Sequence, residues 1–327
     1  MRVFKTRALR RALCSLLPVV VLLGLAGCGK AEQSDYVSDK IAAAAEGIKD
    51  TSLPSRITYE GVTYKLNRDL DTVLFLGIDS EAIAEAREVV GSGGRADTIM
   101  LFVLNDDNRT ARVLELSRDT MTDVDVYNND RKLLYSGTMQ IDMQYAFGES
   151  SARSCALMKG KVSALMEGLR IDSVCSLTIN GLVDVVNAMG GITVTLDEDY
   201  PEIDPTYTAG AVITMDGATV EDFVRYRNTD VFASNDARMQ RQDAFVTELF
   251  TGITEYNTEQ FAELYEAAGN QLCTDLTADR LLDYAGYTLL ETIKIPGETV
   301  AGDLHDEYYI DADALHALIV QIFYLPA

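Results

Sequence analysis

The chain has 327 residues and a formal net charge of −23, with 51 acidic and 28 basic residues. This charge excludes non-specific binding to nucleic acid, because an acidic surface is repelled by phosphate backbones. The five cysteines show neither a disulfide framework nor the spacing of a zinc site. We expect Cys155, Cys175 and Cys273 to be small, buried core residues.

Residues 1–27 have the pattern of an export signal. The basic start MRVFKTRALRR contains no acid, and the apolar run that follows, Ala12 to Ala26, is too short for a comfortable membrane span. The next residues, Leu25-Ala26-Gly27-Cys28, resemble the lipobox of bacterial lipoproteins, whose cysteine becomes the lipidated first residue. We therefore predict a lipid anchor on Cys28 at the extracytoplasmic face of the cell membrane; the alternative is an uncleaved or ordinarily secreted N-terminus.

The rest of the chain reads as a tether over residues 28–55 (or a short helix there) followed by one domain over residues 56–327. A hairpin is predicted over 57–67. Unbroken apolar runs and helical patterns then predict strands at 72–78, 99–105, 112–117, 175–180 and 192–196, and helices at 151–169 and 182–189. This alternation indicates an α/β sandwich with helices on both faces. The segment 251–327 is expected to be a helical extension that ends in an apolar helix packed on the sheet.

Arginines are concentrated in one window, residues 222–242. No lysine occurs between Val162 and Ile293, yet this window holds Arg225, Arg227, Arg238 and Arg241. Arginine suits phosphate because its planar guanidinium offers paired donors and stays charged. FVRYR is expected to be a strand, and Asp236 is expected to cap a helix whose N-terminus faces the same anion. A solvated helix face is the alternative.

Three further polar groups fall at predicted strand ends, where α/β proteins place their sites. They are Asp79 after LFLGI, Arg95 and Asp97 in GRADT, and Arg118 and Asp119 in LSRDT. Each has a simpler explanation, as a helix cap, a surface turn or an exposed ion pair. Together they place carboxylates beside arginines, the arrangement in which Mg²⁺ is bound by one or two carboxylates and phosphate oxygens.

The chain resembles the LytR-CpsA-Psr family. The motifs that carry the resemblance lie in the family's order between residues 71 and 250: LFLGIDS, GRADTIMLFVLN, LELSRDT, QIDMQYAFG, GLVDVVNAMGGITV, and DGATVEDFVRYR followed by NDARMQRQ. The resemblance implies a three-layer α-β-α sandwich with a central mixed sheet and an apolar cavity for a polyprenyl chain. It also implies a phosphotransferase that moves a teichoic acid-like or capsular glycopolymer from undecaprenyl pyrophosphate to a hydroxyl of peptidoglycan.

The family motifs also imply roles for individual residues. Asp79 and Asp97 match the carboxylates that bind Mg²⁺, with Mn²⁺ as an alternative. The pyrophosphate contacts are matched by Arg95, Arg118, Arg225, Arg227, Arg238, Arg241 and Gln242. The candidate catalytic residues are Arg118, Asp119 and Asp236. Each of the two aspartates would act either as a base or as a positioning group.

The sequence departs from the family at three positions near these motifs. Ser117 stands where many members have proline, Gln140 where lysine is frequent, and Asp142 where a neutral residue is commoner. These departures leave the reaction in place but put the charge of the polymer in doubt. Two other functions use the same site: a hydrolase that takes water as acceptor, and a regulatory protein that binds prenyl phosphates without catalysis. His305 and His316 both lie near the C-terminus, which argues against a histidine-based triad.

Overall fold

The computed structural model describes residues 39–48, 51–254 and 256–327. The predicted signal segment and Cys28 lie outside these residues, so lipidation stays a prediction. In the described part of the chain, none of the helices combines the length and apolar character needed to cross a membrane.

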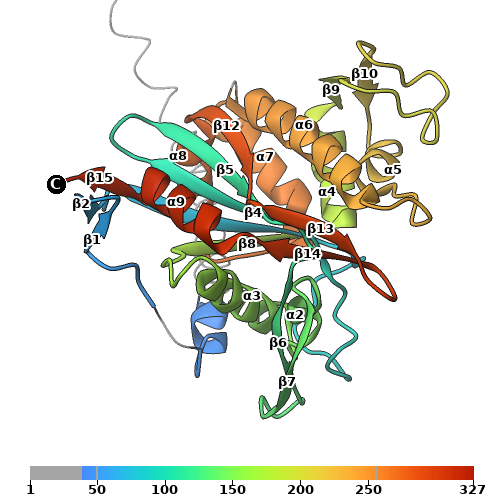
Figure 1. Ribbon diagram of the computed structural model, residues 1–327. Helices are drawn as coiled ribbons and strands as arrows, with labels where there is room; N and C mark the ends of the chain where they lie inside the picture. Colours follow the sequence, from blue (N-terminus) through green and yellow to red (C-terminus); the bar gives the residue numbers. More distant parts are fainter. Residues whose placement is uncertain (1–38, 49–50, 255) are drawn as a thin grey trace, which may run out of the picture.

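A mixed sheet of six strands forms the middle layer of the domain (Figure 1). Its strands, in spatial order, are β11 (Leu272–Thr274), β8 (Ser173–Thr178), β3 (Leu70–Ile78), β4 (Ala96–Asn105), β5 (Thr110–Glu115) and β12 (Thr288–Lys294). β3 runs antiparallel to β4 and parallel to β8, and β12 runs parallel to β5. The four strands predicted between residues 72 and 180 are confirmed. Their continuous apolar runs follow from burial on both faces.

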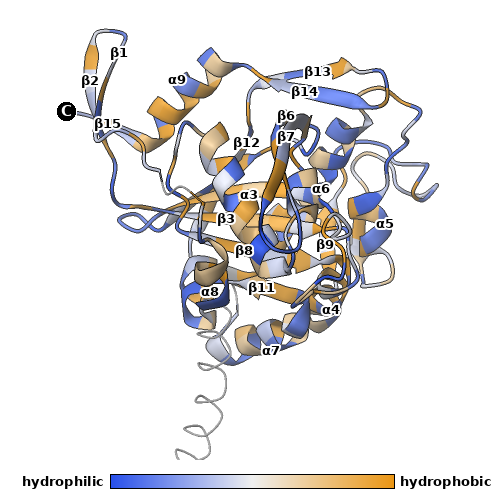
Figure 2. Cartoon of the chain, turned by 90° about the horizontal axis from the view of Figure 1, so that it is seen from below, coloured by the Kyte–Doolittle hydropathy of each residue, from blue (hydrophilic) through white to orange (hydrophobic). Residues whose placement is uncertain are grey.

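Helices cover both faces of this sheet, which confirms the predicted three-layer sandwich. One face carries α3 (Ser151–Leu165) and α9 (Ala312–Phe323), and the other carries α4 (Ile179–Met189), α6 (Ser234–Thr254), α7 (Thr258–Ala268) and α8 (Ala278–Ala285). Side chains alternate along β3: Leu74 and Leu76 join the core under α3 and α9, whereas Val73 packs with residues of α8. Figure 2 shows the hydrophobic residues concentrated in strands such as β8 and β11.

Smaller elements surround the sandwich. The hairpin of β1 (Arg56–Tyr59) and β2 (Val62–Leu66) forms a small sheet with β15 (Tyr324–Pro326). Three further pairs are β6 (Met121–Tyr127) with β7 (Leu133–Gln140), β9 (Ile192–Thr195) with β10 (Val212–Met215), and β13 (Gly297–Ala301) with β14 (Asp306–Ile310). The remaining elements are the helices α2 (Met143–Ala146) and α5 (Val220–Arg225) and the 3-10 turn η1 (Gly269–Gln271). The predicted hairpin at 57–67 is confirmed. Its turn residues Glu60 and Gly61 both have positive φ, 49° and 78°, as a two-residue turn of this kind requires.

Four expectations about local structure were wrong or incomplete. The predicted strand FVRYR is instead the end of helix α5, whose Val220, Phe223 and Val224 are buried at helical spacing; the helix ends at Arg225, and Arg227 lies beyond it. The predicted strand at 192–196 pairs with β10, outside the central sheet. The C-terminal segment supplies the two edge strands β11 and β12 in addition to helices. Residues 39–44 of the predicted tether form a helical turn, and Ile41 joins the main core.

The three cysteines of the domain are buried, as predicted. Cys155 on α3 donates from its thiol to the Ser176 hydroxyl at 3.2 Å. Burial raises the pKa of Cys175 to about 12, so this thiol stays protonated and unreactive at neutral pH.

Candidate active site

Three of the polar groups predicted from the sequence meet at one edge of the central sheet. Asp79 follows β3, Asp97 is the second residue of β4, and Arg118 follows β5. Because β4 is antiparallel to both neighbours, its first residues lie beside the last residues of β3 and β5. The sheet therefore brings together groups that lie up to 39 positions apart in the sequence.

The turn before β4 fixes Arg95 next to Asp79. The Asp79 amide donates to the Arg95 carbonyl at 2.9 Å. Gly94 has φ +74°, and a Cβ at this position would lie 2.8 Å from the Asp79 carbonyl oxygen. Only glycine satisfies both the backbone angle and this close approach.

The Asp97 carboxylate is held by two arginines from different elements. Arg118 donates to one carboxylate oxygen, and Arg238 of α6 lies 3.4 Å from the other. The Arg238 side chain is 3% exposed, and it also donates to Asn235 at 2.6 Å. Burial lowers the pKa of Arg238 to about 10; Asp97 opposes this effect, whereas Arg118 and Arg227 add to it. The arginine remains charged at neutral pH.

Asp119 is a second buried carboxylate between arginines. It accepts a hydrogen bond from the Gln140 amide at 2.7 Å and lies 3.4 Å from Arg118 and 3.8 Å from Arg227. Arg227 in turn donates to the Ser234 hydroxyl at 2.9 Å. Asp119 thus contacts two guanidinium groups at once.

Arg225 and Asp79 form the more open part of the site. Their side chains form an ion pair at 2.6 Å, and each is close to half exposed. Arg225 also pairs with Glu221 one turn earlier on α5. Surface pairs of this kind contribute little to stability, so both groups remain available to a ligand.

Asp142 lies beneath the site and is fully buried. Its carboxylate is 3.7 Å from Arg118 and 3.8 Å from Arg95, and neither of its oxygens accepts a hydrogen bond. Burial raises the pKa of Asp142 to about 6, although the two arginines favour its charged form. Asp142 is one of the departures from the family pattern, and the sequence predicted no site role for it.

Three residues of the predicted site lie outside this network. Arg241 donates its guanidinium hydrogens to the carbonyls of Phe223 and Tyr226, and Gln242 donates to Val224 at 3.0 Å. They therefore tie α6 to α5. Asp236 is in the first turn of α6, two residues after the helix begins at Ser234, and pairs with Lys294 of β12 at 2.6 Å.

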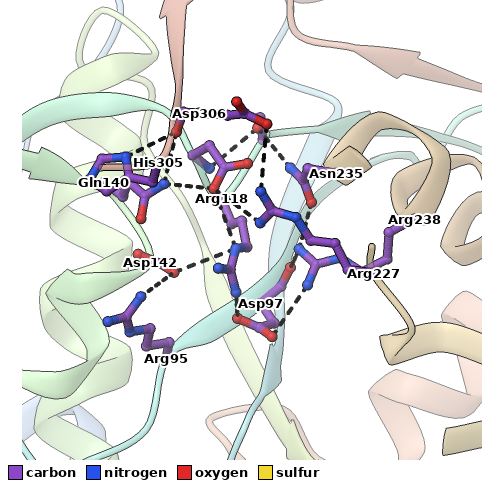
Figure 3. A network of polar contacts seen from close by, with 12 residues as sticks. Arg95, Asp97, Arg118, Gln140, Asp142, Arg227, Asn235, Arg238, His305 and Asp306 are labelled. Carbon is purple, nitrogen blue, oxygen red and sulfur yellow. Dashed lines mark hydrogen bonds and ion pairs between the residues drawn. The ribbon is translucent and has the colours of Figure 1, made fainter. Parts of the chain in front are cut away.

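The structure adds residues that the sequence did not predict. Ser117, which stands where many family members have proline, accepts hydrogen bonds from the Asp119 amide and the Asn235 side chain and so stabilises this turn. Asp306 of β14 lies 3.7 Å from Arg227. Asn235 is the first residue of the NDARMQRQ motif, which offered a signal for it, whereas Asp306 lies far along the chain and no sequence signal marks it. Figure 3 shows this network, with Arg118 at its centre.

An apolar cavity opens beside the charged residues. Its walls include Asp79, Asp97, Arg225 and Arg238 at one end, and its remaining lining is mostly aliphatic and aromatic. A second apolar cavity between the sheet and α6, α7 and α8 shares three lining residues with it, Phe75, Val246 and Leu249. Because they share these residues, the two cavities lie next to each other under α6, and we call the pair the apolar passage.

Asp79 and Asp97 are the carboxylates available to a metal ion. Both line the same cavity, and arginines compensate both charges. Among the described residues, no group of three or more histidine, cysteine or acidic side chains is placed to bind a metal. Two carboxylates that leave coordination positions to phosphate and water suit Mg²⁺ better than an ion that requires a full set of protein ligands.

Comparison with known proteins assigns the family. The model of the LytR_cpsA_psr family matches residues 35–321. The chain belongs to this family. It is 24% identical over 270 residues to the polyisoprenyl-teichoic acid–peptidoglycan teichoic acid transferase TagU of Bacillus subtilis, covering 82% of this chain and 80% of TagU. It is 23% identical over 319 residues to TagV of the same organism, covering 91% of this chain and 73% of TagV.

Solved structures share the fold. The crystal structure of B. subtilis TagV superposes with a TM-score of 0.60 at 21% identity, covering 79% of this chain and 97% of that one. A structure of TagT bound to LI-WTA also superposes with a TM-score of 0.60, at 20% identity, and the match covers 84% of this chain and 96% of that one. The family and fold that the motifs predicted are therefore confirmed.

Proposed function

We propose that this protein is a phosphotransferase that moves a glycopolymer from a polyprenyl pyrophosphate carrier to a hydroxyl of peptidoglycan. The observation that carries the proposal is the arginine and aspartate network at the mouth of a long apolar cavity. A ligand with a pyrophosphate head and a hydrocarbon tail fits both parts. Transfer of teichoic acid to peptidoglycan is the activity named for the relatives TagU and TagV, and it supports a polymer of this class here.

The arginines supply the binding energy for the pyrophosphate. Arg225 and Arg238 line the cavity mouth, and Arg118 and Arg227 lie next to them in the network. Guanidinium groups held in place before the substrate arrives need no reorganisation during reaction, which makes them effective on charge that develops in the transition state. Phosphoryl transfer depends mainly on such positioning.

Asp79 and Asp97 would hold the Mg²⁺ ion of the proposed enzyme. When bound, Mg²⁺ neutralises charge on the phosphate oxygens. The chain's own contribution is to place both carboxylates at the cavity mouth, where Asp79 pairs with Arg225 and Asp97 pairs with Arg118 and Arg238.

The proposed reaction balances without a covalent enzyme intermediate. The acceptor hydroxyl oxygen forms a bond to the phosphorus that carries the glycan, and the bond from this phosphorus to the bridging oxygen breaks. The electron pair of that bond leaves with the polyprenyl monophosphate, and the hydroxyl proton passes to solvent. In this proposal Arg118, which pairs with Asp97 and Asp119, contacts the transferred phosphate.

One experiment separates this function from its two alternatives. The protein is incubated with Mg²⁺ and a glycan on polyprenyl pyrophosphate, with and without peptidoglycan oligomers. A transferase gives glycan-labelled peptidoglycan in the complete mixture. Free glycan phosphate in equal yield with and without the acceptor would indicate a hydrolase, and bound but unchanged donor would indicate a prenyl phosphate-binding protein.

A further inference from the structure

A groove with a mixed polar and apolar lining lies beside the network, at the base of two hairpins. Its lining includes Arg95, Thr138, Met139, Gln140, His305 and Glu307. The β6–β7 hairpin forms one wall, and the β13–β14 hairpin with its connecting loop forms the other. The bridge between Thr120 and Tyr308 joins the two hairpins at their base (Figure 1).

This groove and the apolar cavity approach the network from different sides. Gln140, Arg95 and His305 lie on one side of Arg118, and Asn235 and Arg238 lie on the other (Figure 3). The first three line the groove, whereas Arg238 lines the apolar cavity. The hydrogen bond from Gln140 to Asp119, at 2.7 Å, connects the groove directly to the network.

We propose that the groove binds the acceptor, a peptidoglycan glycan strand, while the apolar cavity holds the tail of the donor. This inference rests on the proposed function. In phosphoryl transfer the attacking and leaving oxygens lie roughly in line on opposite sides of phosphorus. The leaving group carries the hydrocarbon tail and must lie toward the apolar cavity. The attacking hydroxyl therefore has to arrive from the side that the groove occupies.

The chemistry of the lining fits a sugar strand better than a lipid. Arg95 is 47% exposed and only loosely paired, since its guanidinium lies 3.8 Å from Asp142. Thr138, His305 and Glu307 add a hydroxyl, an imidazole and a carboxylate, which donate to and accept from sugar hydroxyls. Met121, Met139 and Met143 also line the groove, and their flexible side chains can pack against the apolar faces of sugar rings.

Two groove variants test the proposal. Thr138→Trp narrows the groove, and His305→Ala removes an exposed polar group without filling it. The matched controls are Leu134→Trp, which places the same bulky side chain at an exposed position of β7 nearer the hairpin tip, and His316→Ala, which removes the other histidine, on α9. The assays are the KM for peptidoglycan oligomers in the transfer reaction, and the affinity of each variant for the polyprenyl pyrophosphate donor.

We expect Thr138→Trp to raise the acceptor KM about tenfold and His305→Ala to raise it by a smaller factor, with donor affinity within about twofold of wild type. Acceptor KM values at the wild-type level for both groove variants, or a matching loss of donor affinity, would overturn the inference. Thermal melts identify a variant that does not fold, and the milder His305→Ala then decides. A wild-type protein that binds donor but yields no transfer product would instead overturn the proposed function.

Discussion

Charges in the site are compensated by shared partners. Asp97 contacts Arg118 and Arg238, and Asp119 contacts Arg118 and Arg227. Removal of one member leaves another buried charge without its partner. The resulting loss of folding free energy exceeds the contribution of the direct contact. The effects of substitutions within this group should therefore not be additive.

The carboxylate pair Asp79 and Asp97 gives a prediction with two readouts. Asp79→Asn and Asp97→Asn should each weaken Mg²⁺ binding, because an amide offers a neutral oxygen in place of a charged ligand. Calorimetric titration with Mg²⁺ measures binding directly, and transfer assays follow in parallel. Asp130→Asn, at an exposed turn between β6 and β7, is the control. Wild-type Mg²⁺ affinity in the double Asn variant would assign the ion to other groups.

Asp142 should make the stability of the domain depend on pH. Burial raises its pKa in the folded state to about 6, above the ordinary value of 3.8, so the folded protein binds a proton more tightly than the unfolded chain. Its favourable contribution is present below about pH 4 and is lost as pH rises through about 6. A difference of this size corresponds to at most about 3 kcal/mol. Denaturant unfolding between pH 4.5 and 7.5 measures it.

The Asp142→Asn variant should lack this part of the pH dependence, because its amide does not ionise. Relative to wild type, it should gain stability as the pH rises from 4.5 to 7.5. Asp130→Asn serves again as the control. If wild type and Asp142→Asn lose stability in parallel over this range, another buried acid is responsible. Glu115, whose pKa burial raises to about 8, is the first candidate.

At the scale of elements, the sequence predicted what depends on local pattern. The buried strands were found from their apolar runs, and the charged residues at their ends were found from the motifs. The hairpins β6–β7 and β13–β14 were not predicted, because their strands lack the continuous apolar run of a buried strand. The pairing of β9 with β10 was not predicted either, because a long loop separates these two strands. Asp306 reaches the site through such a hairpin.

The directions of the arginine side chains on α6 also could not be predicted from the sequence. Arg238 and Arg241 are three residues apart and were expected to face one anion. A helix advances 100° per residue, so the two side chains differ in direction by about 60°. This difference places Arg238 at Asp97 and Arg241 at the C-terminal end of α5. Arg241 is therefore expected to position Arg225 and Arg227 indirectly.

Arg241→Ala and Arg227→Ala should separate these two roles. Loss of the buried Arg241 removes charge-assisted bonds to two carbonyls, each worth about 1.5–3 kcal/mol. It should lower the melting temperature by roughly 5–10 °C along with activity. Arg227→Ala should lower transfer by about 10²–10³. Its change in melting temperature should be smaller than that of Arg241→Ala, because the buried Asp119 keeps its contacts with Arg118 and Gln140. Arg170→Ala, a largely exposed arginine, is the control for both assays. Equal melting temperatures for the first two variants would contradict the assignment.

For the whole molecule, the predicted lipid anchor on Cys28 gives a test of how the protein is attached to the membrane. Cys28→Ala should abolish lipidation and release the protein from the membrane fraction, because a lipid on this residue is the predicted anchor. Fractionation of cells that express each form, with mass spectrometry of the N-terminus, measures both effects. Cys14→Ala, within the predicted signal segment, is the control. Membrane attachment of Cys28→Ala at the wild-type level would exclude this anchor.

The length of the apolar passage should determine which donors bind well. Leu249 of α6 lines both cavities and lies where they join. In the wild-type protein, affinity for a prenyl pyrophosphate should rise with chain length, since each buried CH₂ contributes up to about 0.8 kcal/mol. Leu249→Trp should block the passage and leave only the cavity near the arginines. Short-chain donors should then bind as in wild type, and long-chain donors should lose their advantage.

Binding measurements with a ten-carbon and a long-chain prenyl pyrophosphate test this selectivity. Leu325→Trp, at an exposed position on β15, is the control for the bulk of the new side chain. Equal losses for both donors in Leu249→Trp would mean that the substitution disturbs the arginines rather than the passage. A wild-type protein that binds both donors equally would place the hydrocarbon tail outside the cavity. Selectivity lost in Leu249→Trp and kept in Leu325→Trp would assign the tail to the space under α6.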